Sequence, residues 1–530
     1  MRVRNSRILG AVALTMALVV SACGSSKSDT SADGTVIDKN AQNAASSALA
    51  NTTTTAAETA APTKITSMAD YEALWKTQRE AVVKRIEDNG WGWDQAGQKV
   101  TGPGGFSIDL TTCPAGWDPY AGLSDGTIHL GQNLASSGPL ADYGNIGVAQ
   151  KIYYDYINSL GGITDSTGKT WKISTDIRDD AYDPAKAVPI IDELLDSEGV
   201  FALETLGSPA TMKVYDKINS RCVPDAYIGS GHPAWGDPVN HPWVWGHQLA
   251  YNTEAILWGG LLEKKFAGKP EITVAGLIMQ NDFGKAYELG FNEFIKTSKL
   301  KINFVFERIE PTAPTITNQM TTLASKKPDV FIAMTAGTSC AQAITEAANN
   351  GLKDTATMLF QPSVCKAKSF VGKDAVGGDG SASNGWWIVG GGAKDFTDPT
   401  NASDPWVAFG LDLLEKAGHP ISESSSLGTG FYFAWPVTQA LMIAAALPGG
   451  VSRPNLVVAA RTLDMTNPHL IDGVKYNMDG NNDIDPIEGS EISVYDSAKQ
   501  GWVAQEDIGI IELSCKSKPC AWDQGTSSCK

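Results

Sequence analysis

The chain has 530 residues, of which 42% are hydrophobic and 53 are glycine, and its formal net charge at pH 7 is −17. These values are typical of a globular α/β chain long enough for two or three domains with sizeable cores. So large an excess of acidic residues provides no attractive field for nucleic acid or for anionic lipid headgroups. We therefore exclude nucleic acid as a partner.

The N-terminus has the pattern of a secretory signal. A basic start precedes an apolar run over residues 8–20, which is too short and wrongly flanked for a membrane-spanning helix. Ser21-Ala22 followed by Cys23 resembles the lipobox of bacterial lipoproteins, in which the cysteine is acylated and becomes the first residue. The alternative is an ordinary signal peptide cut near Ser21-Ala22.

The next segment favours the lipid anchor. Residues 24–64 are rich in Ser, Thr, Ala and Asn and contain no aromatic residue, so we expect a disordered tether there. Residues 1–23 are then a signal peptide that ends at a lipidated Cys23. This arrangement predicts a protein held on the extracytoplasmic face of the cell membrane by a lipid rather than by a spanning helix.

The cysteines indicate disulfides rather than metal or redox chemistry. Eight are present, and with Cys23 set aside an odd number remains, so at least one thiol is free or pairs elsewhere. No two stand at C-x-x-C spacing and none has a histidine nearby. We expect no metal and no cofactor.

From residue 125 onward, strands and helices alternate in two series. The first series has strands expected at 127–131, 172–177, 200–203 and 226–228, and helices at 143–160, 184–196 and 212–219. The second has helices at 253–266, 285–297, 316–324 and 340–348, and strands at 272–278, 302–307, 330–334 and 358–360. The pattern predicts an α/β fold of two lobes, each a doubly wound parallel sheet with helices on both faces.

The predicted domains follow from these series. An accessory segment, 65–124, includes a helix expected at 68–87 with a partial apolar stripe. Lobe one comprises 125–248 and 388–470, and lobe two comprises 249–387 and 471–512, with crossovers near residues 247–248, 387–388 and 470 as a multi-crossover hinge. A Cys-containing tail, 513–530, completes the chain. Ligands of open α/β sheets bind beyond the carboxyl ends of the strands, so two facing lobes make a cleft.

Several motifs occur in one order along both series. They are 131–144 (GQNLASSGPLADYG), 156–163 (YINSLGGI), 179–187 (DDAYDPAKA), 206–210 (LGSPA), 229–233 (GSGHP), 280–284 (QNDFG) and the stretch 328–352. Together they resemble the leucine/isoleucine/valine-binding group of type I periplasmic binding proteins, the solute receptors of ABC importers. The resemblance covers roughly residues 127–496 and leaves the accessory segment and the tail unexplained.

The resemblance implies a set of ligand-binding residues. The glycine loops of lobe one are expected to direct free backbone N–H groups into the cleft and bind a carboxylate or carbonyl oxygen, and Tyr143 is expected to close over the ligand. The full set is Tyr143, Leu206, Gly207, Ser208, Gly229, Ser230, Gly231, His232, Trp235, Phe283, Ala336 and Gln361. The alternatives are tight turns for the glycines, a buried aromatic for Tyr143, a loop histidine for His232 and core packing for Trp235.

Departures from the family's pattern limit the class of ligand that we expect. Amino-acid-binding members pair the ligand's ammonium with a glutamate, but residues 360–365 contain no acid, and Ala336 stands where the family has an aromatic residue. An unpaired buried ammonium costs several kcal/mol. We therefore expect an apolar or aromatic ligand with a carboxylate or amide end rather than a free amino acid.

The family's disulfide partners fall on Tyr182 and Gly207, so that bridge is absent here. Cys340 opens a helix and Cys365 follows the next parallel strand, so both are expected at the ligand-side edge of lobe two. We predict a Cys340–Cys365 disulfide in place of the family's bridge.

The leading function is a lipid-anchored solute receptor, not an enzyme, that binds a small molecule and delivers it to the permease subunits of an ABC importer. A ligand-sensing subunit of a signalling protein is an alternative. An exported hydrolase is a remote one, because the chain has no Gly-x-Ser-x-Gly motif and its histidines show no metal-ligand spacing. The acidic run 479–488 lacks the glycine and glutamate of a calcium loop and is interpreted as a polar hairpin turn.

Overall fold

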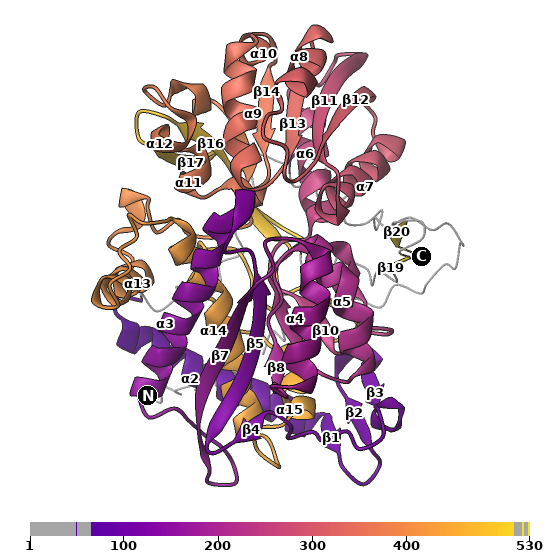
Figure 1. Cartoon of the computed structure of the whole chain (residues 1–530), viewed down its shortest axis with the longest axis vertical. Coiled ribbons are helices and arrows are strands. Elements are labelled where there is room, and N and C mark those ends of the chain that lie inside the picture. The colour runs from indigo at the N-terminus through magenta and orange to yellow at the C-terminus, as the bar shows by residue number, and fades with distance from the viewer. Residues whose placement is uncertain (1–48, 50–64, 514–521, 524–527, 530) are drawn as a thin grey trace, which may run out of the picture. The chain divides into compact units, whose positions relative to one another are not determined.

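The computed structural model describes residues 49, 65–513, 522–523 and 528–529 (Figure 1). All of them belong to one compact unit, Gly34–Lys530. The predicted signal peptide, Cys23, the predicted tether apart from residue 49, and most of the predicted tail lie outside the described residues.

The first sheet has the strand order β10-β9-β8-β5-β7-β6, with β4 paired to β5. Its central pairings are parallel, whereas β6 at one edge and β4, which pairs with the start of β5, are antiparallel additions. The strands are β4 (Leu123–Ser124), β5 (Thr127–Leu134), β6 (Ile163–Thr164), β7 (Thr170–Asp179), β8 (Ala202–Leu203), β9 (Asp225–Ile228) and β10 (Val244–Gly246). This sheet, with its helices, is lobe one.

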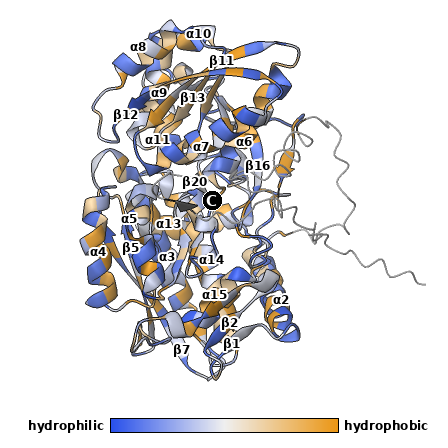
Figure 2. Ribbon diagram, turned by 90° about the vertical axis from the view of Figure 1, so that its right-hand side faces the viewer, coloured by the Kyte–Doolittle hydropathy of each residue, from blue (hydrophilic) through white to orange (hydrophobic). Residues whose placement is uncertain are grey.

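Helices cover both faces of the first sheet. On one face α3 packs against α14, and on the other α4 packs against α5. Each face has its own hydrophobic cluster, the larger around Tyr153 and Phe431 and the smaller around Ile191 and Leu194. Figure 2 shows hydrophobic and hydrophilic residues alternating around α4, as expected of a helix with one face on a sheet. The helices are α3 (Gly144–Ser159), α4 (Pro184–Asp196), α5 (Ser208–Ser220), α13 (Pro405–Lys416), α14 (Ser426–Ala446) and α15 (Arg453–Arg461).

The second sheet, which forms lobe two, has the order β12-β11-β13-β14-β15-β16-β17, with β18 paired to β16. The first five strands are parallel and the last pairings are antiparallel. The strands are β11 (Glu271–Met279), β12 (Lys301–Ile309), β13 (Val330–Met334), β14 (Met358–Gln361), β15 (Trp387–Val389), β16 (Gly489–Asp496), β17 (Gly501–Ala504) and β18 (Ile510–Glu512). The helices are α6 (Tyr251–Lys265), α7 (Asp282–Thr297), α8 (Thr317–Ser325), α9 (Thr338–Asn349), α10 (Leu352–Thr355), α11 (Lys368–Val371) and α12 (Lys373–Val376).

The chain crosses between the sheets after β10, after β15 and before β16. The first two crossings lie at the predicted positions, but the third lies nearer 488 than 470. Tyr476, Met478 and Ile487 are buried in the core of lobe one, so most of the segment 471–488 packs there and not in lobe two. The third crossing differs from the prediction because these apolar side chains are buried in lobe one. The alternation of strands and helices along the sequence does not predict that burial.

The accessory segment packs on lobe one. Helix α2 (Met68–Asp88) begins at Ser67, whose side chain accepts a hydrogen bond from the Asp70 N–H, and it buries Tyr71, Trp75, Val82 and Ile86. The Trp75 ring contacts Trp406 and Trp435 of lobe one. Strands β1 (Gly92–Asp94), β2 (Lys99–Thr101) and β3 (Ser107–Asp109) form a separate antiparallel sheet.

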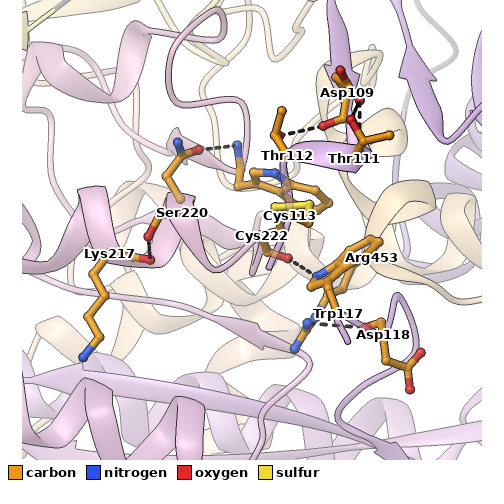
Figure 3. Close-up of a disulfide and its surroundings, with 12 residues drawn as sticks. Asp109, Thr111, Thr112, Cys113, Trp117, Asp118, Lys217, Ser220, Cys222 and Arg453 are labelled. Carbon is orange, nitrogen blue, oxygen red and sulfur yellow. Dashed lines mark hydrogen bonds between the residues drawn. A yellow bond between two sulfur atoms is a disulfide. The ribbon is translucent and has the colours of Figure 1, made fainter. Parts of the chain in front are cut away.

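A disulfide that the sequence did not predict joins the accessory segment to lobe one (Figure 3). Cys113 pairs with Cys222, which follows α5, and the Trp117 Nε1–H donates to the Cys222 carbonyl at 2.9 Å. Beside it, the Arg453 guanidinium donates to the carbonyls of Val200 and Phe201 at 2.8 and 3.0 Å. The predicted Cys340–Cys365 disulfide is also present, with a Cα–Cα distance of 5.9 Å.

Candidate ligand-binding site

A cavity of about 150 Å³ lies between the two lobes, at the carboxyl ends of the parallel strands. Loops after β7, β8 and β9 of lobe one and after β11, β13 and β14 of lobe two contribute to its lining. A further part of the wall is formed by the crossing segment after β15 and by the residues beside it. We call this part the hinge end; it comprises residues 390–391 and 393–396 with Lys366, Tyr432 and His469. The position of the cavity matches the rule that ligands of open α/β sheets bind at this edge.

Seven aromatic side chains among the described residues line the cavity wall. They come from both lobes and from the hinge end, and most of them are buried. The set is Tyr143, Tyr182, Tyr251, Phe283, Phe396, Tyr432 and Phe433. Such a wall favours a ligand with an apolar or aromatic body.

Tyr143 bridges the two lobes beside the cavity. It ends a 3₁₀-helix, η3 (Gly138–Tyr143), and its hydroxyl donates to the Val364 carbonyl at 3.1 Å. The same hydroxyl accepts from the Gly337 N–H at 3.2 Å, and the ring packs on Phe370. Burial raises the pKa of Tyr143, so the phenol stays protonated. Tyr143, which is predicted to close over the ligand, therefore forms contacts with lobe two across the cleft.

A second bridge lies next to Tyr143. The Asp142 carboxylate accepts from the hydroxyls of Ser424 and Ser426, at 2.7 and 2.5 Å, at the N-terminus of α14. It also accepts from the Ser369 hydroxyl of lobe two at 2.8 Å. The Ser369 N–H donates to the Ser425 hydroxyl oxygen at 2.9 Å. A carboxylate is favoured at a helix N-terminus, and here it also joins the lobes.

The glycine loops differ from the prediction. Backbone N–H groups of Gly207, Gly229 and Ser230 were expected to point into the cleft, but each donates to a backbone carbonyl of these two loops or of the strand ends beside them. Gly207 donates to the Gly229 carbonyl, Gly229 to Thr205 and Ser230 to Ile228. A buried N–H without a partner is costly, so the loops satisfy these groups internally. The expectation of free donors at these three positions was wrong.

Gly207 nevertheless has a specific role in the wall. Its φ of +96° is a conformation that side chains with a Cβ rarely adopt, and a Cβ there would lie 2.5 Å from Tyr182 Cε2. The Tyr182 ring therefore packs directly on the loop that precedes α5. The two positions at which the family has a disulfide are thus neighbours here, joined by packing instead.

The predicted ligand-binding residues divide into two groups. Those that line the cavity are Tyr143, Leu206, Gly207, Gly229, Phe283 and Ala336. Among the described residues, those that do not line it are Ser208, Ser230, Gly231, His232, Trp235 and Gln361. Their ligand-binding roles remain predictions.

The residues of the second group are held in the protein interior. The hydroxyls of Ser208 and Ser230 hydrogen-bond to each other at 2.8 Å, and the Gln361 amide donates to the Cys340 carbonyl at 3.0 Å. A Cβ at Gly231 would lie 2.4 Å from the Leu249 carbonyl oxygen.

His232 and Trp235 pack against each other behind the loop. The His232 Nδ1 accepts from the Ala234 N–H at 3.2 Å, and the Trp235 ring packs on Tyr215. Burial lowers the pKa of His232 to about 3, so its imidazole is neutral.

The hinge end contains charged residues that the sequence analysis missed. Lys366 donates to the Glu491 carboxylate at 2.5 Å and to the Ala393 carbonyl at 2.6 Å. Lys394 donates to Asp404 and to the Pro468 carbonyl. The sequence could have indicated these residues, because 390–396 (GGGAKDF) directly follow β15. This strand is parallel to β14, so its carboxyl end lies at the same edge of the sheet as those that precede the other cavity loops.

Asp395 and His469 also line the hinge end. One Asp395 oxygen accepts from the N–H and hydroxyl of Thr397, both at 2.7 Å, and burial raises the pKa of this carboxyl. The His469 Nδ1 accepts from the Trp406 Nε1–H at 3.2 Å. Burial lowers the pKa of His469 well below its usual range, so the ring is neutral.

A buried acid stands behind the lobe-two loop that contains none in sequence. The Glu254 carboxyl, on α6, accepts from the Ser363 N–H at 2.8 Å and hydrogen-bonds the hydroxyls of Ser363 and Tyr287, each at 2.7 Å. Burial raises the pKa of Glu254 to about 8. Ser363 lines the cavity, whereas Glu254 is not among the described residues that line it. The loop that contains Ser363 therefore has a carboxyl group, that of Glu254, within hydrogen-bond distance, but with a pKa of about 8 this group is protonated and neutral at pH 7.

Within the described part of the chain, no cluster of three or more His, Cys, Asp or Glu side chains is arranged to hold a metal ion. In the acidic run, Asp479 N–H donates to the Asp483 carbonyl and Asn482 N–H to the Asp479 carbonyl, which closes a tight turn. The described helices include none that is both long and apolar enough to cross a bilayer.

Comparisons with solved structures agree with this architecture. A fatty acid ABC transporter substrate-binding protein from Thermomonospora curvata superposes with a TM-score of 0.61 at 22% identity, covering 76% of this chain and 96% of its own. A branched chain amino acid ABC transporter protein from Thermus thermophilus, with bound valine, has a TM-score of 0.59 at 16% identity, covering 72% and 96%.

A solute binding protein from Rhodopseudomonas palustris BisB5, in complex with 3,4-dihydroxy benzoic acid, also has a TM-score of 0.59 at 16% identity, covering 74% and 98%. A comparison with curated proteins finds no match. The profile of the family described as "Periplasmic binding protein" matches residues 127–397, which is more than half of the chain. The chain therefore belongs to the periplasmic binding protein family, in its type I, leucine/isoleucine/valine-binding group.

Proposed function

We propose that this protein is a lipid-anchored solute receptor that binds a small carboxylic acid or amide with an apolar or aromatic body and delivers it to an ABC importer. The observation that carries the proposal is the aromatic cavity between the lobes. It is bounded by hydrogen bonds that join the lobes, from Tyr143 to Val364 and from Ser369 to Asp142. A cavity closed by contacts between two lobes suits capture and release of a solute better than catalysis.

The structural relatives support this ligand class. Their names record a fatty acid transporter, bound valine and bound 3,4-dihydroxy benzoic acid, so the fold accommodates acids with apolar bodies. In this chain Tyr182 lines the cavity, and its hydroxyl, which forms no hydrogen bond with a described residue, offers a donor for a carboxylate. An α-ammonium would meet Glu254 only in its neutral form near pH 7.

A screen of thermal stability against a panel of metabolites tests the proposal. A ligand that binds only the folded state raises the unfolding temperature in proportion to its affinity and concentration. We expect stabilisation by a subset of carboxylic acids. Stabilisation by none of the carboxylic acids or amides in a broad panel would contradict the proposed ligand class.

The lipid anchor is tested separately. If Cys23 is acylated, the Cys23→Ala variant should be shed into the medium or remain unprocessed, because acyl chains provide its membrane affinity. Membrane association unchanged in that variant would rule the anchor out. The alternative function is that of a ligand-sensing subunit of a signalling protein. Co-purification of this protein with a permease, and not with a signalling protein, would contradict that alternative.

A further inference from the structure

Two tyrosines that line the cavity have hydroxyls without a hydrogen-bond partner in the described part of the protein. Tyr182 is 8% exposed and Tyr432 is 5% exposed, and both line the cavity. No hydrogen bond of either hydroxyl to a described residue is found, whereas the hydroxyls of the other two tyrosines of the wall have partners. Tyr143 bonds to Val364 and Gly337, and Tyr251 accepts from Gln248. Burial raises the pKa of both phenols, so each keeps its proton. Each hydroxyl is therefore a donor that an acceptor group of a bound solute can use.

The two hydroxyls belong to different ends of the cavity. Tyr182 packs on Gly207, next to the N-terminus of α5. The Tyr432 ring stacks on His469 with ring centroids 5.0 Å apart, and the Phe396 ring stacks on the same imidazole at 5.1 Å. Since Phe396 follows Asp395 in the chain, Tyr432 and Asp395 both belong to the hinge end. The cavity therefore has one polar end at Tyr182 and another at Tyr432, with aromatic rings between them.

Asp395 adds an acceptor at the hinge end. Thr397 occupies only its Oδ1, and Oδ2 forms no hydrogen bond with any described residue. A free donor on Tyr432 and a free acceptor on Asp395 match a group that both accepts and donates a hydrogen bond. A hydroxyl does both, whereas an ammonium only donates and would leave the Tyr432 proton without an acceptor.

We propose that the solute carries a hydroxyl group at the end opposite its carboxylate, and that Tyr432 and Asp395 bind this hydroxyl. Tyr432 donates a hydrogen bond to the oxygen of this hydroxyl, and Asp395 accepts a hydrogen bond from it, while Tyr182 donates to the carboxylate. The solute class is thus a hydroxy-substituted carboxylic acid with an apolar body. This inference rests on the proposed function and names its substrate more narrowly.

Matched pairs of acids test the inference by titration calorimetry on the full chain. The pairs are benzoate with 4-hydroxybenzoate, and hexanoate with 6-hydroxyhexanoate. We expect the hydroxylated member of at least one pair to bind about tenfold more tightly or better, because a site that hydrogen-bonds a hydroxyl rejects the analogue that lacks it. In Tyr432→Phe this advantage should vanish, whereas Tyr182→Phe should weaken both members of the pair equally.

The outcomes separate the inference from the proposed function. Equal affinity within both pairs would overturn the hydroxyl site and leave a receptor for simple carboxylic acids. Tighter binding of 4-(aminomethyl)benzoate than of 4-hydroxybenzoate would overturn it in favour of an ammonium at Asp395. An advantage that persists in both Tyr432→Phe and Asp395→Asn would place the hydroxyl elsewhere, and binding of none of these acids would count against both proposals.

Discussion

At the scale of single residues, backbone conformation and burial determine the shape and charge of the cavity. Gly207 allows the loop before α5 to approach the Tyr182 ring, and Glu254 supports the lobe-two loop through Ser363. Neither role depends on contact with a ligand. Both can therefore be tested on the free protein.

Replacing Gly207 by alanine should destabilise the protein in two ways. The backbone conformation of Gly207, with φ of 96° and ψ of 129°, costs about 1–3 kcal/mol for a residue with a Cβ, and the contact with Tyr182 adds about 1–3 kcal/mol. Gly168→Ala is a matched control, because Gly168 has a φ of +86° but a Cβ there would have no atom within 4 Å. Chemical denaturation should show the larger loss for Gly207→Ala, and equal losses would contradict the close packing on Tyr182.

The buried Glu254 should make stability depend on pH. Its pKa is raised from 4.5 to about 8 in the folded protein, so the folded state holds a proton that the unfolded state releases above about pH 4.5. The stabilisation is complete below the unfolded pKa and is lost as the pH rises towards 8. Compared with Glu254→Gln, the wild type should lose a few kcal/mol of unfolding free energy between about pH 5 and 8. Parallel pH profiles of the two proteins would contradict a raised pKa.

At the scale of elements, most of the fold could be predicted from the sequence. Helix α7 shows why, because its apolar positions repeat with helical spacing and Asn281 caps its N-terminus. The third crossing could not be predicted in the same way. Residues 471–488 form no helix or strand, so only tertiary burial of Tyr476 and Met478 assigns them to lobe one.

The site was less predictable than the fold. Strand ends indicated loops that line the cavity, including those of Tyr143 and Gly207, because parallel strands align their carboxyl ends. The loop hydrogen bonds were missed, since the N–H groups of Gly207 and Gly229 find their partners, the carbonyls of Gly229 and Thr205, only once the strands are in register. Glu254 was missed because it reaches Ser363 from a helix more than a hundred residues away in sequence.

The two disulfides should differ in what their removal changes. Cys113–Cys222 closes a loop of 109 residues and Cys340–Cys365 one of 25, so the first restricts the unfolded chain more. Replacing both cysteines of the first pair by serine should cost about 2–5 kcal/mol of stability and leave the cavity unchanged. The second pair lies beside Val364, a cavity residue, so its removal should also weaken ligand binding. Weaker binding in the first variant and unchanged binding in the second would contradict this division.

At the scale of the whole molecule, the two lobes meet closely beside the cavity. A Cβ on Gly337, in lobe two, would lie 2.7 Å from the Pro139 carbonyl oxygen of lobe one. Tyr143 and Asp142 form their hydrogen bonds to lobe two in the same region. The described arrangement is therefore a closed one, which a hinge at the crossing segments can open.

Gly337→Ala should oppose closure. Gly351→Ala is its control, because Gly351 is also in lobe two and has a φ of +77°, yet no atom lies within 4 Å of its Cβ position. We expect Gly337→Ala alone to weaken ligand binding, by about tenfold or more, and to keep a larger radius of gyration when solute is added. Wild-type affinity and compaction in Gly337→Ala would contradict closure through this contact.

The central claim is that the cavity binds a carboxylic acid rather than a free amino acid, and one calorimetric comparison tests it most directly. Leucine and 4-methylpentanoate differ only in the α-ammonium, which lies beside the carboxylate and therefore away from Asp395. Burying this charge without an ionised partner costs about 2–5 kcal/mol, so 4-methylpentanoate should bind at least about thirtyfold more tightly than leucine. Tighter binding of leucine, or of isoleucine or valine over their deaminated analogues, would contradict the account.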